Sequence, residues 1–134
     1  MVSKIIWLLV IAAAVVVLVP PVRERVWPKL QPALNPVYEW NARTRVNDIR
    51  DLVKRADATG RPVPSAPDEF AHFVDSEDMQ EDASVDPWGT VYYIVFDRAT
   101  FRVGSAGKDR QPGTADDILS NPEPLSHVVD PRRR

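Results

Sequence analysis

The longest run of apolar residues lies near the amino terminus, where residues 5–19 carry no polar side chain. As a helix this run rises about 22 Å, and continuing it through Val22 gives about 27 Å, slightly less than the hydrocarbon core of a bilayer. A cleaved signal peptide is disfavoured because no small-x-small site follows the run. A buried helix of a globular protein is disfavoured because the remaining chain is too small to surround it. The pattern therefore predicts an uncleaved transmembrane signal anchor over residues 1–22.

Prolines punctuate the chain after this segment, at positions 20, 21, 28, 32 and 36. Proline removes a backbone donor and disfavours helix at the preceding residue. We therefore expect residues 23–35 to form a semi-extended, Pro-rich juxtamembrane stalk. Trp27 either anchors this stalk at the lipid headgroups or packs on the following domain, and the sequence leaves both open.

A globular domain is expected over residues 36–120, beginning with an amphipathic helix. Asn35 and Pro36 are typical of a helix cap and first turn, and Gly60 supplies the turn that ends the helix. Between them, apolar residues recur every three or four positions and define one face: Tyr38, Ala42, Val46, Ile49, Leu52, Val53 and Ala56.

Shorter elements follow this helix. Residues 65–68 open a second helix that carries Phe70, Phe73 and Val74, and the acidic residues 75–86 are expected to form a loop. Residues 90–96 and 100–103 are rich in β-branched and aromatic side chains, which predicts a β-hairpin. The fold class is therefore α+β, with a helix packed on a short antiparallel sheet and residues 121–134 as a tail.

Charge is divided along the chain, although the formal net charge is only −2. Residues 23–55 hold eight basic and four acidic side chains, whereas residues 57–86 hold nine acidic ones against Arg61 alone. A basic segment followed by an acidic one suits a position near anionic lipid headgroups. Nucleic-acid binding is not expected, because the basic residues are interleaved with carboxylates and no recognised binding motif accompanies them.

Catalytic chemistry finds little support in the sequence. The chain has no cysteine, which removes disulfides, thiolate zinc sites and cysteine nucleophiles together. His72 and His127 each lack a nearby serine–carboxylate pattern, and a lone histidine is usually structural. We therefore expect no enzymatic activity and no small-molecule substrate.

The chemically informative residues gather in one loop, residues 105–118. It contains the carboxylates of Asp109, Asp116 and Asp117, and Gly107 and Gly113 allow the backbone to turn sharply. Calcium takes about six to eight oxygen ligands, commonly carboxylates and backbone carbonyls, so such a loop can curl around one ion. It is not an EF-hand, because the spacing and the terminal Glu are absent. The alternative is a polar turn whose Asp side chains cap nearby amides.

This loop, together with Asp86-Pro87-Trp88-Gly89 and Tyr92-Tyr93, resembles the carboxy-terminal half of the major (G-type) pseudopilin of type II secretion systems. The similarity covers roughly residues 37–118. It implies an exported domain, and hence a single-pass protein of the bacterial inner membrane with its carboxy-terminal domain in the periplasm. It also implies a structural calcium ion bound after the sheet, with these ligands: the side chains of Asp109, Asp116 and Asp117, and carbonyls around Ser105.

The pseudopilin resemblance stops before the amino-terminal segment. Pseudopilins are processed between a Gly and a Phe and carry a Glu near the start of the mature helix, whereas residues 5–19 contain none of these residue types. We therefore expect a non-catalytic, membrane-anchored structural subunit that contacts the bilayer. Its domain would bind and stabilise integral membrane subunits of a respiratory, photosynthetic or secretory complex. Two alternatives remain: a pseudopilin of a type II secretion or type IV pilus-like machine, and a solute or ion sensor.

Overall fold

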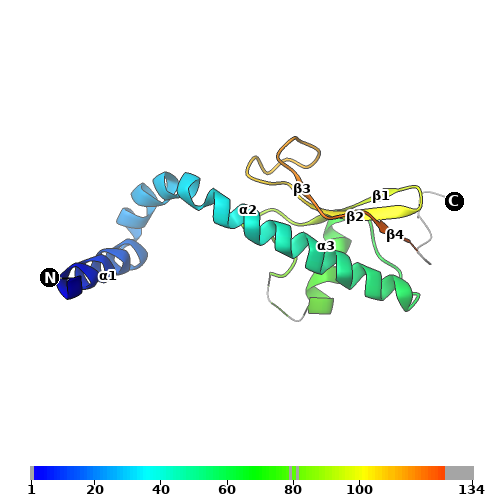
Figure 1. Ribbon diagram of the computed structural model, residues 1–134, viewed down its shortest axis with the longest axis horizontal. Coiled ribbons are helices and arrows are strands. Elements are labelled where there is room, and N and C mark those ends of the chain that lie inside the picture. The colour runs from blue at the N-terminus through cyan, green and yellow to red at the C-terminus, as the bar shows by residue number, and fades with distance from the viewer. Residues whose placement is uncertain (1, 79, 81, 126–134) are drawn as a thin grey trace. The chain divides into compact units, whose positions relative to one another are not determined.

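A computed structural model describes residues 2–78, 80 and 82–125 of the chain. The chain divides into two compact units, residues 1–36 and 37–134. His127 and most of the predicted tail lie outside the described residues. The elements, shown in Figure 1, are α1 (Val2–Leu18), α2 (Pro20–Ala58), α3 (Pro67–Asp78), β1 (Tyr93–Asp97), β2 (Thr100–Ser105), β3 (Ile118–Leu119) and β4 (Glu123–Pro124).

Helix α1 contains most of the apolar run but is shorter than the predicted anchor. It ends at Leu18, and a new helix begins at Pro20. Its 17 residues rise about 26 Å, less than the roughly 30 Å of a hydrocarbon core. Within the described part of the chain, no helix combines the length and apolar character needed to cross a membrane. The predicted transmembrane signal anchor over residues 1–22 is therefore wrong, and so is the predicted single-pass location in a bacterial inner membrane with a periplasmic domain.

The predicted semi-extended stalk is also wrong, because residues 23–35 are helical and belong to α2. Pro28, Pro32 and Pro36 lie inside this helix. Each proline removes one hydrogen bond to the carbonyl four residues earlier. All three prolines are exposed and lie four residues apart, so they share one helix face. Water can therefore hydrate the three carbonyls that lose their N–H donors. All three lie on one side of the helix, and their hydration keeps the loss of helix stability small.

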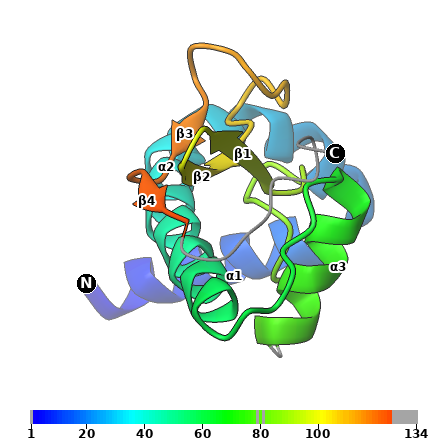
Figure 2. The same cartoon turned by 90° about the vertical axis from the view of Figure 1, so that its right-hand side faces the viewer.

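The carboxy-terminal unit is α+β, as expected, with a small antiparallel sheet. β2 pairs with β1 along one side and with both β3 and β4 along the other. The predicted hairpin is confirmed, with Asp97 opposite Thr100 across a turn in which Arg98 has a φ of 50°. Figures 1 and 2 show the carboxy-terminal half of α2 and the whole of α3 on the same face of this sheet.

The core of this unit lies between the sheet and its two helices. The apolar face predicted for the long helix is buried from Ala42 to Ala56, and Tyr38 packs against the same cluster. α3 contributes Phe70, Phe73 and Val74, and the sheet contributes Ile94, Phe101, Val103 and Ile118. α3 extends to Asp78, so the predicted acidic loop begins later than residue 75. The apolar residues of the helices recur every three or four positions and those of the strands every second position, so both sets face this one layer.

Candidate metal-binding loop

The acidic loop connects two paired strands, which hold its ends together. Ser105 at the end of β2 lies opposite Ile118 at the start of β3. Gly107 has a φ of +67°, and a Cβ placed on it would lie 2.9 Å from Oδ2 of Asp116. The same Cβ would lie 2.4 Å from the backbone carbonyl oxygen of Asp116, so only glycine permits this close approach without displacing the Asp116 main chain and side chain. The sequence therefore folds residues 106–117 back on themselves, so that the beginning of the loop touches its end.

Asp116 and Asp117 are adjacent in this loop, and their carboxylates accept hydrogen bonds from other residues of the same loop. Thr114 Oγ1 lies 2.8 Å from Asp116 Oδ1 and 3.3 Å from Asp117 Oδ1. The backbone N–H of Asp109 donates to Asp116 Oδ2 at 3.0 Å, and that of Gly113 donates to Asp117 Oδ2 at 2.6 Å. The bond from the Asp109 amide is the largest cause of a lowered pKa at Asp116, so this carboxylate stays ionised at neutral pH.

Asp109 and Ser105, the other two predicted ligands, are placed differently. Asp109 Oδ1 accepts the backbone N–H of Gln111 at 2.8 Å, and both the main chain and the side chain of Asp109 interact with Asp116. Ser105 is fully buried. Its hydroxyl donates to Asp86 Oδ2 at 2.7 Å and accepts the N–H of Gly107 at 3.2 Å. The structure thus brings Asp116 and Asp117 together, while the Ser105 side chain is used in hydrogen bonds to Asp86 and Gly107.

The donor set fits a hard cation in part. Carboxylates and carbonyl oxygens are the ligands that calcium takes, and two adjacent carboxylates are present. However, no three acidic or histidine side chains of the described residues converge in a way that could hold a metal ion. An ion here would be bound by Asp116 and Asp117 with backbone carbonyls completing its shell.

Asp86 of the Asp-Pro-Trp-Gly segment is the polar centre behind the loop. This carboxylate is 4% exposed and accepts four hydrogen bonds. The donors are the amides of Trp88 at 3.1 Å and Thr90 at 2.8 Å, the Thr90 hydroxyl at 2.6 Å and the Ser105 hydroxyl. Through Ser105 and Gly107, Asp86 connects the turn before β1 to the start of the acidic loop. The sequence singled out this segment only for its resemblance to pseudopilins.

Tyr93 and Thr114 contact the acidic loop, and sequence reasoning missed both. The Tyr93 hydroxyl donates to Asp117 Oδ2 at 2.5 Å. Burial, and after it this bond, raises the pKa of the phenol, so Tyr93 remains a donor at neutral pH. The hairpin offered a signal for Tyr93: a turn with Asp97 opposite Thr100 places Tyr93 opposite Gly104, at the strand end from which the loop departs.

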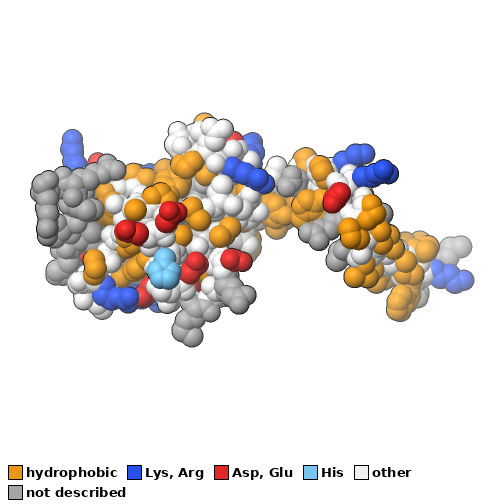
Figure 3. Space-filling model, turned by 180° about the vertical axis from the view of Figure 1, so that it is seen from behind, with side chains coloured by type: hydrophobic (Ala, Val, Ile, Leu, Met, Phe, Trp, Pro, Cys, Tyr) orange, Lys and Arg blue, Asp and Glu red, His pale blue; other side chains and the backbone are white. Residues whose placement is uncertain are grey.

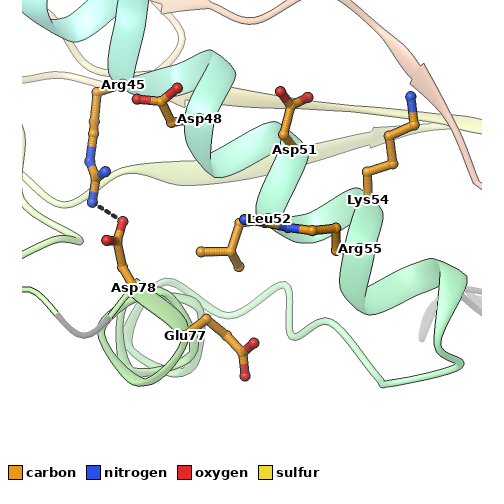
Figure 4. A pocket seen from close by; sticks show the side chains of 8 residues that line it. All are labelled: Arg45, Asp48, Asp51, Leu52, Lys54, Arg55, Glu77 and Asp78. Carbon is orange, nitrogen blue, oxygen red and sulfur yellow. Dashed lines mark hydrogen bonds and ion pairs between the residues drawn. The ribbon is translucent and has the colours of Figure 1, made fainter.

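A second feature of this unit is a groove of about 670 Å³ between α2 and α3 (Figure 4). Most of its charged side chains are paired within the domain. Arg45 bonds to Asp78, Glu77 bonds to Arg61, and Lys54 lies 3.2 Å from Glu123. Arg45 and Asp78 are both half-buried, and each of the other two pairs has one exposed partner. Exposed ion pairs contribute about 0–1 kcal/mol each. The groove therefore has the features of a solvated network of ion pairs, and it shows no arrangement of a nucleophile and a base. Its lining residues are Arg45, Asp48, Asp51, Leu52, Lys54, Arg55, Glu77 and Asp78.

His72 is exposed on α3. Asp68, Glu69 and Asp75 are exposed on the same helix. Its imidazole forms no hydrogen bond or ion pair with another described residue. This is the environment of a solvated helix face.

No protein-family model matches the chain, and no curated protein or solved structure matches it either. The similarity to the major pseudopilins therefore stays a prediction from the sequence.

Proposed function

We propose that this chain is a non-catalytic structural subunit that assembles with other protein subunits through α1. The observation that carries the proposal is the surface of α1 itself. Seven consecutive residues, Ile5–Ile11, are each more than half exposed. Seven residues span almost two helical turns, so the apolar surface surrounds the helix. Figure 3 shows hydrophobic side chains on the face of α1 that is turned toward the viewer.

A helix that is apolar on every side is stable only when other groups cover it. Burying one Leu, Ile or Val side chain stabilises an assembly by about 1.5–3 kcal/mol. The globular unit has a separate core of its own, formed by residues 42–118. We infer that apolar helices of partner subunits cover α1 and that the globular unit is the part held beside them.

The first test is the composition of the native assembly. The tagged full-length chain, produced in its own host and extracted with a mild detergent, should be recovered with a fixed set of other subunits. Native mass spectrometry measures both the stoichiometry and the intact mass of the chain. Recovery of the chain alone would contradict the proposal.

Leu9→Glu is expected to reduce recovery of the partner subunits at least tenfold, because it places a charge in the middle of the apolar helix. Glutamate favours helix about as well as leucine, so α1 itself should persist. Leu119→Glu is the matched control, since Leu119 is 44% exposed on β3 and lies outside α1. Equal recovery of partners with Leu9→Glu and with the unchanged chain would contradict the role of α1.

A pseudopilin is the second candidate, and the course of α2 favours it. In place of the expected stalk, the structure has a helix that leads directly into the domain, from Pro20 to Ala58. A long amino-terminal helix is what the resemblance to pseudopilins implies. This candidate predicts filaments of the chain alone and a shortened amino terminus. The same mass measurement therefore separates the two functions.

We further propose that the acidic loop binds calcium as a structural ion. The support is the pair of adjacent carboxylates at Asp116 and Asp117, together with the sequence resemblance. A ligand that binds only the folded state stabilises it by about 2.7 kcal/mol at a concentration one hundred times its dissociation constant. We therefore expect calcium to raise the melting temperature above that in EDTA, and Asp117→Asn to remove this difference. A melting curve that does not respond to millimolar calcium would contradict the proposal.

A further inference from the structure

Tyr93 lies on the face of the sheet that is turned away from the helices. Its neighbour Ile94 is buried in the core, and successive side chains of a strand point to opposite faces. Gly104 is directly opposite on β2. A Cβ on Gly104 would lie 2.7 Å from the Tyr93 hydroxyl oxygen and 2.8 Å from its Cε2. The ring therefore lies across Gly104, in space that any side chain there would fill.

From this position the phenol reaches the acidic loop. Its hydroxyl donates to Asp117 Oδ2, and the same oxygen accepts the amide of Gly113 at 2.6 Å. One oxygen of Asp117 is thus fixed both by the sheet and by the loop. The other oxygen, Oδ1, is left turned toward Thr114, which it shares with Asp116.

We propose that Tyr93 is the positioning residue of the acidic loop: it orients the Asp117 carboxylate beside Asp116 and so sets the affinity of the loop for calcium. The effect on affinity rests on the calcium binding proposed above. A hydrogen bond to a carboxylate is stronger than one between neutral groups, and a ring that lies against Gly104 has few other conformations. The loop is thus preorganised in its binding geometry, which lowers the conformational entropy lost when the ion binds.

Two substitutions in the full-length chain test separately the hydroxyl of Tyr93 and the position of its ring over Gly104. Tyr93→Phe keeps the ring and removes the hydroxyl. Gly104→Ala keeps the hydroxyl and displaces the ring. Tyr38→Phe is the control, because the Tyr38 hydroxyl has no hydrogen bond to another described residue and its ring packs against Trp88. Calcium affinity is measured by calorimetric titration, and hydrogen exchange of residues 106–117 is measured by mass spectrometry in EDTA.

Removing a group that orients a metal ligand typically weakens metal binding about 10- to 100-fold. We expect at least a tenfold loss of calcium affinity with Tyr93→Phe, a similar loss with Gly104→Ala, and none with Tyr38→Phe. Because both changes act through one contact, the double variant should bind no more weakly than the weaker single variant. A general loss of stability would instead make the two effects add. In EDTA, residues 106–117 should exchange faster in Tyr93→Phe.

The outcomes separate this inference from the calcium proposal. Wild-type affinity in Tyr93→Phe would overturn the positioning role and leave calcium binding intact. If the unchanged chain binds no calcium, the calcium proposal fails, and hydrogen exchange alone then decides the matter. Unchanged exchange of residues 106–117 in Tyr93→Phe would overturn the positioning role, and faster exchange would support it.

Discussion

Replacing Asp86 by alanine is expected to lower the free energy of unfolding of the globular unit by about 3–5 kcal/mol. The substitution leaves the buried Ser105 hydroxyl and the buried amide of Trp88 without their acceptor. An unsatisfied buried donor costs about 1–3 kcal/mol, and Thr90 loses two bonds to the same carboxylate. Because small domains are stable by only about 5–15 kcal/mol, much of the fold's stability depends on this side chain.

Two controls test the mechanism behind this loss. Asp86→Asn retains one acceptor oxygen and the volume of the side chain, so its effect should be clearly smaller. Asp97→Ala removes an exposed carboxylate at the hairpin turn and should change stability by less than about 0.5 kcal/mol. Urea unfolding followed by near-ultraviolet circular dichroism measures all three. Equal losses for the alanine and asparagine variants would show that acceptor chemistry is not the cause.

The parts of the fold that the sequence predicts correctly are those with a long periodic pattern. The apolar spacing from Ala42 to Ala56 repeats over four helical turns, and every one of its positions is buried. The hairpin follows from two runs of β-branched and aromatic residues around a short turn. β3 and β4 could not be predicted this way, because each has two residues and pairs with β2 only through contacts distant in sequence.

The predictions for the amino-terminal segment were wrong because they rested on the presence of prolines and not on the spacing of those prolines. Prolines 28, 32 and 36 suggested an extended stalk, but their common spacing of four residues confines the lost hydrogen bonds to one exposed helix face. The predicted anchor continues the apolar run across Pro20 and Pro21 to Val22, whereas α1 ends before them at Leu18. In both cases the outcome depended on where the prolines fall relative to a helix, rather than on their number.

The candidate site was predicted in residue type more than in geometry. Sequence reasoning identified the loop and its carboxylates, since three Asp residues within nine positions, close to two glycines, are visible in the chain. It did not identify Tyr93: hairpin register places this residue beside the start of the loop, but the contact with Asp117 joins residues 24 positions apart. It also could not show that Ser105 directs its hydroxyl to Asp86, away from the loop carboxylates.

Phe101→Ala is expected to destabilise the globular unit by about 3–5 kcal/mol, the usual range for removing a buried phenylalanine. Phe101 is 0% exposed and lies at the centre of the sheet, opposite Phe96 on β1 and Glu123 on β4. Its ring belongs to the layer between the sheet and the two helices. For a domain of this size, each kcal/mol lowers the melting temperature by about 4–8 °C. The melting temperature should therefore fall by at least about 12 °C.

Arg102→Ala is the matched control for this substitution, because Arg102 is the next residue of β2 and is exposed on the opposite face. Its loss should change the melting temperature by no more than a few degrees. Phe101 and Ser105 belong to the same strand, so the variant tests whether the loop that departs from β2 depends on this packing. If Phe101→Ala lowers the melting temperature and calcium still raises it by the wild-type amount, the loop and the core are energetically separate. If the calcium response disappears as well, the sheet is the element that transmits core packing to the acidic loop.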